Sequence, residues 1–165
     1  MDRTDFLNSL QAFTEAVVKN SAFPVSFQRD DAQEPKARPP AVYKMRLPDP
    51  KSATKKAPYI LHQIVTGKDQ QKPGQQQTAS SVTVRTIFCV YNDDEQEGGM
   101  LLLQLMERVR IAMLRKRVIS NRYALDMEAA LECLCYPEDT APYFAGEMVS
   151  VWRLPAVEME VPNWP

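Results

Sequence analysis

The sequence predicts one α+β domain over residues 1–165, in which a mostly antiparallel sheet of about four to five strands carries two helices packed on one face. Two amphipathic helical patterns are separated by strand patterns, which gives the order helix, strands, helix, two strands. The connections between successive strands are short, and this favours antiparallel pairing. With 165 residues, 44% of them apolar, the chain is long enough to bury a core without disulfides.

The first helix is predicted over residues 5–19, with Thr4 as its N-cap. Its apolar side chains recur at helical spacing and share one face: Phe6, Leu10, Phe13 and Val17. A short extended piece is expected after it, over residues 23–27.

A proline-rich, basic arm is predicted over residues 28–57. The chain has 13 prolines and only 5 glycines, and proline removes backbone donors, so we expect much of this stretch to be irregular. Only residues 42–47 read as a strand within it, and the flanking prolines suit a place at the edge of the sheet.

Two strands are predicted next, over residues 59–66 and 82–91. The first is apolar on both sides, which is typical of a central strand. Between them, residues 67–80 hold five glutamines and a Pro-Gly pair. We expect this segment to be a polar, flexible loop at the end of a hairpin.

The second helix is predicted over residues 98–116, after a cap at residues 92–94 and acidic residues in its first turn. Its apolar stripe is continuous: Leu102, Leu105, Met106, Val109 and Met113. Two antiparallel strands are then expected over residues 125–135 and 143–154, followed by a C-terminal tail over residues 156–165.

Composition argues against several classes of protein. No apolar run reaches the length needed to cross a bilayer, and the first residues lack the pattern of a signal peptide, so no membrane partner is expected. A net charge of −1 provides no overall attraction to nucleic acid. Three cysteines without a secretory context are expected to stay reduced.

No catalytic residue, metal site or cofactor is predicted. His62 has no visible nucleophile or carboxylate partner, so we expect it to pack on a face of the sheet. Cys133 and Cys135 are spaced as neighbours on one side of a strand, which is poor geometry for zinc, and small buried thiols are the favoured interpretation. The acidic run near residue 94 lacks the spacing of a calcium loop.

Contacts between copies of the chain are predicted instead. The second helix carries more apolar residues than its stripe requires, and such a surplus marks an interface when it is exposed. Acidic and basic groups lie at opposite ends of this helix, and we hypothesise that they face each other across neighbouring protomers. The predicted interface residues are Asp93, Asp94, Glu95, Glu97, Leu103, Ile111, Leu114, Arg115 and Arg117, with Lys68, Gln70 and Lys72 of the polar loop.

Residues 58–155 resemble phage tail terminator (tail completion) proteins of long-tailed phages and prophages of Gram-positive bacteria. Three segments carry the resemblance in their pattern and order. They are residues 57–61 (APYIL), residues 82–88 (VTVRTIF) with 91–94 (YNDD) leading into 105–110 (LMERVR), and residues 143–152 (YFAGEMVSVW) leading to Leu154 and Pro155.

The resemblance implies an α+β fold and a homo-oligomeric, hexameric ring on the finished tail tube. Its implied partners are the tail tube protein and the head–tail connector proteins, and no enzyme activity or cofactor is implied. The implied location is the tail or neck of the virion, which is assembled in the host cytoplasm. The longer basic arm and the Trp-bearing tail of this chain depart from the family pattern.

Two other classes stay open at this stage. A DNA-contacting neck, head–tail joining or minor capsid accessory protein would use the lysines of the arm and would bind DNA with a steep salt dependence. A thiol- or metal-dependent enzyme would use Cys89, Cys133, Cys135 and His62, and would contain stoichiometric metal.

Overall fold

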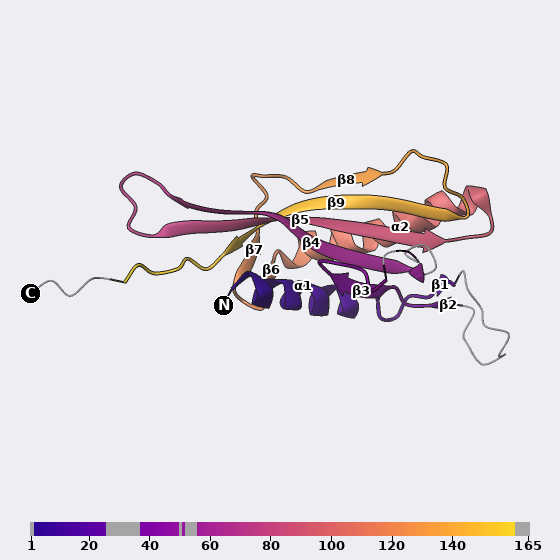
Figure 1. Cartoon of the computed structure of the whole chain (residues 1–165), viewed down its shortest axis with the longest axis horizontal. Helices are drawn as coiled ribbons and strands as arrows, with labels where there is room; N and C mark the ends of the chain where they lie inside the picture. Colours follow the sequence, from indigo (N-terminus) through magenta and orange to yellow (C-terminus); the bar gives the residue numbers. More distant parts are fainter. Residues whose placement is uncertain (1, 26–36, 50, 52–55, 161–165) are drawn as a thin grey trace, which may run out of the picture.

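The structure is a computed structural model that describes residues 2–25, 37–49, 51 and 56–160. Two helices and a strongly elongated sheet make up this part of the chain (Figure 1). Residues 28–36, 50 and 52–55 of the predicted arm lie outside the described residues, as do the last five residues of the predicted tail. In chain order the elements are α1 (Arg3–Val18), β1 (Phe23–Pro24), β2 (Ala37–Arg38), β3 (Ala41–Lys44), β4 (Tyr59–Gln71), β5 (Thr78–Tyr91), α2 (Glu95–Lys116), β6 (Val118–Ile119), β7 (Tyr123–Leu125), β8 (Glu132–Cys135) and β9 (Tyr143–Leu154).

The α+β class and the mostly antiparallel sheet are confirmed, but the predicted number of strands is wrong. Within the described residues the main sheet has seven strands in the order β3-β4-β5-β9-β7-β6, with β8 also paired to β9. Only β3 and β4 run parallel. Instead of one strand over residues 125–135, the chain forms β7 and β8, because the Asp126 carboxylate accepts a hydrogen bond from the Glu128 backbone N–H and turns the chain between them.

Helix α1 begins two residues earlier than predicted, at Arg3, because Asp2 and not Thr4 is the N-cap. The Asp2 carboxylate accepts from the Asp5 backbone N–H at 2.9 Å, and the Asp5 carboxylate accepts from the Asp2 N–H at 3.1 Å. This reciprocal capping box satisfies donors that a helix start otherwise leaves free.

Both helices pack on one face of the sheet, as predicted. All five residues of the predicted α2 stripe are buried. They meet alternate residues of β4, β5 and β9, and α1 adds Phe6 and Leu10 to the same cluster. Trp152 of β9 is fully buried there, with its ring centroid 5.6 Å from that of Phe6.

The predicted flexible loop over residues 67–80 is mostly regular. The β4–β5 ladder continues from the pair Gly67–Val82 to the pair Gln71–Thr78, so only residues 72–77 form the turn. A β-bulge between Ile64 and Thr66 interrupts the register where the hairpin leaves the body of the sheet. Figure 1 shows the distal part of this hairpin, residues 65–80, as a two-stranded ribbon that projects beyond the helices.

The first turns of α2 provide a matched test of its packing on β9. A Cβ at Gly98 would lie 1.9 Å from the Phe144 ring, whereas a Cβ at Gly99 meets nothing within 4 Å. We expect Gly98→Ala to destabilise the fold by about 1–3 kcal/mol through overpacking. Gly99→Ala should stabilise it by about 0.5–1 kcal/mol because alanine is the better helix former. Urea unfolding measures both, and equal effects would contradict the packing described.

Candidate interaction surface

The predicted acidic group at the start of α2 divides into two roles. Asp94 is the N-cap, and its carboxylate accepts from the Gln96 and Glu97 backbone N–H groups at 3.0 and 3.3 Å. Asp93 accepts a hydrogen bond from the Tyr91 hydroxyl. The side chains of Glu95 and Glu97 are exposed in the first turn, so they are the members left to meet a partner.

The basic group at the other end of α2 divides in the same way. Arg117 is the C-cap, and its Nε donates to the Leu114 carbonyl at 3.1 Å, so its side chain closes the helix. Arg115 is exposed in the last turn. The helix has 22 residues, so the acidic and basic ends are about 30 Å apart and cannot meet within one copy.

The apolar residues predicted on α2 are only partly available. Leu103 and Ile111 are exposed, whereas Leu114 packs partly buried against the core. Ile111 and Arg115 line a shallow groove together with Val17 of α1. The structure therefore places a basic group beside an apolar one on the outer surface of the helical layer.

The predicted residues of the polar segment lie on the projecting ribbon. Lys68 and Gln70 are exposed on β4, and Lys72 is exposed in the turn. The neighbouring Asp69 is paired with Arg3 of α1 at 2.8 Å, which ties the ribbon to the start of that helix. The predicted interface residues thus occupy separate regions: two ends and one face of α2, and the ribbon.

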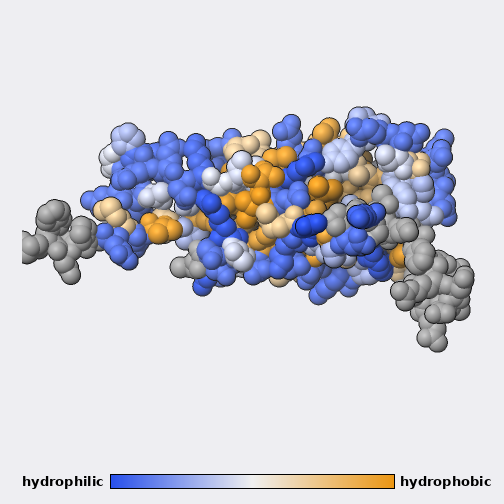
Figure 2. Space-filling view, viewed as in Figure 1, coloured by the Kyte–Doolittle hydropathy of each residue, from blue (hydrophilic) through white to orange (hydrophobic). Residues whose placement is uncertain are grey.

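A further surface was not predicted from the sequence, namely the face of the sheet that carries no helix. Leu61 of β4 and Cys89 of β5 are buried at the centre of this face. On one side they are covered by Leu47 and Ala57, which belong to the segment between β3 and β4. The register places Val149 and Val151 of β9 on the same face, half-buried and under no helix. Figure 2 shows apolar side chains gathered across the middle of this view, over the sheet.

A polar network crosses the same open face. Arg85 of β5 donates from Nε to the Glu147 carboxylate at 2.6 Å and from Nη2 to the Tyr136 hydroxyl at 3.0 Å. The hydrogen bond to Tyr136 makes the largest contribution to raising the pKa of Arg85 above its ordinary value, and the hydrogen bond to Glu147 makes the next largest. The guanidinium is therefore held in place between strands, and its half-exposed position leaves it available to a partner.

His62 is fully buried between α1 and the sheet. Its Nε2 lies 2.8 Å from the Thr14 hydroxyl oxygen and its Nδ1 lies 2.8 Å from that of Thr86. Because the Thr14 hydroxyl donates to the Leu10 carbonyl, the network assigns the proton to Nε2, and Nδ1 accepts from Thr86. Burial lowers the pKa of His62 to about 3, so the ring is neutral.

The cysteines do not converge with this histidine into one site. Cys89 is buried on the open face of the sheet, and burial raises the pKa of its thiol to about 11. Cys133 and Cys135 are exposed on β8, so the predicted burial of these two thiols is wrong. The reason is that β8 is a short strand at the edge of the sheet. Across the part of the chain that the structure describes, no group of three His, Cys, Asp or Glu is arranged to hold a metal ion.

Two basic residues of the predicted arm act within the fold. The Arg38 guanidinium donates to the carbonyls of Lys56 at 2.7 Å and Pro58 at 3.0 Å, and so fixes the return of the chain toward β4. The Lys44 ammonium donates to the Asn8 side chain of α1. These contacts give both cations a structural role.

No family model matches the chain, and no curated protein matches it significantly. Neither described helix is both long and apolar enough to cross a membrane.

Proposed function

We propose that this chain is a tail-terminator-like structural protein of a phage or prophage, which assembles into a hexameric ring. The ring caps the tail tube and presents a surface to the head–tail connector, in the tail or neck of a virion assembled in the host cytoplasm. Support comes from the resemblance of residues 58–155 and from the α+β arrangement with both helices on one face of the sheet.

The observation that carries the proposal is the presence of unlike surfaces on one chain. One side has a helical layer with Ile111 and Arg115 on its outer surface, and the other has an open sheet face that continues into a projecting ribbon. A ring is built from a heterologous contact, in which two different patches of the same chain meet and the rotation closes. Both kinds of patch are exposed in the described chain.

Charge reversal at the ends of α2 tests the ring contact. Arg115→Glu should reduce assembly, because the exposed basic end then repels Glu95 and Glu97 of the neighbouring copy. Adding Glu95→Lys and Glu97→Lys to the same chain should restore it. Arg117 is left unchanged because it caps the helix.

Light scattering at a series of concentrations measures the loss and the rescue. Arg122→Glu is the matched control and should have little effect, because this exposed arginine lies in the turn between β6 and β7 and does not line the groove of Ile111 and Arg115. An assembled mass that is unchanged by Arg115→Glu would reject this pairing of the helix ends.

The DNA-contacting alternative makes a different prediction. It requires binding to duplex DNA that falls steeply as salt increases, because phosphate contacts release counterions. The proposed ring protein should show no such binding at physiological salt. Fluorescence anisotropy with a labelled duplex at two salt concentrations separates the two functions.

A further inference from the structure

The segment that follows β9 has the pattern of a strand but pairs with nothing in the described chain. Val157 and Met159 are 77% and 82% exposed, more than any other large apolar residues described. They alternate with Glu158 and Glu160, so an extended backbone would place the apolar pair on one side and the acidic pair on the other. Such alternation is typical of a strand with one face buried.

The projecting ribbon offers an edge without a partner. Strand β3 pairs with β4 only from Tyr59 to His62, whereas β4 continues to Gln71. Along residues 65–71 no described strand lies against the outer edge of β4. Met45 and Val65, 49% and 50% exposed, lie where this open edge begins. An unpaired edge of this length is a template for another strand.

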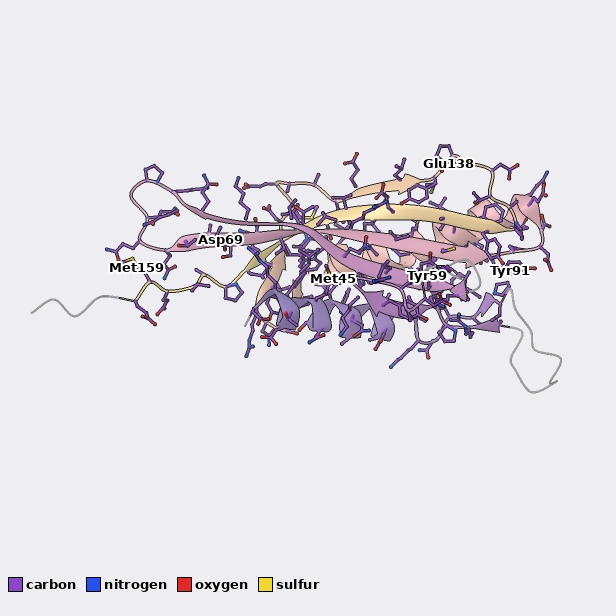
Figure 3. The ribbon with its side chains drawn as sticks, in the orientation of Figure 1. Met45, Tyr59, Asp69, Tyr91, Glu138 and Met159 are labelled. Atoms are coloured by element: carbon purple, nitrogen blue, oxygen red, sulfur yellow. The ribbon has the colours of Figure 1, made fainter. Side chains whose placement is uncertain are left out.

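The chain's own tail leaves on the wrong side to reach this edge. Strand β9 pairs with β5 up to the pair Leu154–Ser80. Pro155 then has no N–H to donate, so it ends the ladder. The tail thus departs from the β5 side of the ribbon, and the open edge belongs to β4 on the opposite side. Figures 1 and 3 show tail and ribbon extending separately, with Met159 and Asp69 labelled.

Opposite charges favour binding of the acidic tail to the open edge of β4. The ribbon carries Lys68 and Lys72, both exposed. Its one carboxylate among residues 65–80, Asp69, is paired with Arg3. The net charge at the edge is therefore positive, opposite to that of Glu158 and Glu160.

We propose that residues 156–160 of one copy add as a strand to the open edge of β4, residues 65–71, of a neighbouring copy. Backbone hydrogen bonds would supply the pairing, as in other cases of strand addition, and the Lys–Glu contacts would set its place. Each copy has one tail and one edge, so the contact is heterologous and propagates around a ring. The inference rests on the proposed ring and identifies one of its contacts.

Proline substitution tests backbone pairing without touching the folded body. Only alternate N–H groups of a strand face its partner, so Glu158→Pro and Met159→Pro are made separately. We expect at least one of them to raise the concentration of half-assembly by about tenfold. Glu158→Ala and Met159→Ala are the matched controls, which keep the N–H and should shift assembly less than their proline counterparts.

Disulfide trapping tests where the tail binds. In a chain with Cys133→Ser and Cys135→Ser, Lys68→Cys is placed in one copy and Glu158→Cys in a second copy carrying a longer tag. Mild oxidation of the mixture should give a covalent heterodimer on a non-reducing gel. Glu138→Cys in place of Lys68→Cys is the control, because Glu138 lies at the opposite end of the molecule from Met159 (Figure 3).

The outcomes separate this inference from the function on which it rests. A proline-sensitive assembly with a cross-link specific to the Lys68–Glu158 pair supports the strand addition. A normal ring that is insensitive to both prolines, with no cross-link above the Glu138 control, overturns the strand addition and leaves the ring intact. A parent chain that stays monomeric overturns both.

Discussion

Acidification from pH 6.5 to pH 4.5 is expected to cost the fold about 2–3 kcal/mol through His62 alone. Burial lowers the pKa of His62 to about 3, whereas an unfolded chain returns it to 6.5. Between these values the unfolded state takes up a proton that the folded state refuses. Stability is therefore retained above pH 6.5 and falls by about 1.4 kcal/mol for each unit of pH below it.

A variant that cannot titrate isolates this contribution from the carboxylates. His62→Gln keeps polar atoms near Thr14 and Thr86, and it should be less stable than the parent at pH 7. The stability of the variant should change less between pH 6.5 and pH 4.5 than the stability of the parent protein does. Urea unfolding at each pH provides both curves, and parallel curves for parent and variant would show that His62 is not held neutral.

Trp152→Ala is expected to destabilise the fold by about 3–5 kcal/mol, a large share of the stability of a domain. The indole is fully buried, lies beside Phe6 of α1, and donates from Nε1 to the Ser150 hydroxyl at 2.9 Å. Its removal leaves a cavity and takes a donor from a buried hydroxyl. Since Trp152 pairs with Val82 at the base of the ribbon, we also expect weaker assembly.

Trp152→Phe is the matched control. It retains an aromatic ring beside Phe6 but loses the hydrogen bond, so its cost should be about 1–2 kcal/mol. Calorimetric unfolding of the two variants gives the comparison. A loss for alanine no larger than that for phenylalanine would mean that the packing around Trp152 contributes little.

Strong apolar periodicity explains which elements were predictable. β9 was predicted with the bounds that the structure has, since Met148, Ser150 and Trp152 alternate with residues of the other face and Pro155 ends the ladder. The stripe of α2 was also confirmed in full. In both cases side-chain burial and backbone pairing follow the same pattern, so the sequence contains the information.

The ribbon was not predicted because its side-chain pattern and its backbone pairing do not agree. Residues such as Gln70 and Ser80 give no apolar alternation, yet backbone hydrogen bonds pair this stretch of β4 and β5 whatever the side chains. The environment of His62 was equally hidden, because Thr14 and Thr86 are far from it in sequence. The open face became visible only once both helices were found on the other side of the sheet.

The candidate site was predictable in part for a related reason. Helix ends attract charge for local reasons, so Asp94 and Arg117 are explained as caps, and Glu95, Glu97 and Arg115 remain as the exposed candidates for an interface. Sequence alone could not separate these roles, because cap geometry depends on which backbone groups each side chain reaches. The edge along β4 required knowing where β3 ends.

Self-association through unlike surfaces is the central claim, and the mass of the free protein tests it most directly. Light scattering on a size-exclusion column, with negative-stain images of the same fractions, should give about 113 kDa, six times the 18.8 kDa chain, and rings with six-fold symmetry. A species of 18.8 kDa at every accessible concentration, with no rings in the images, would contradict it.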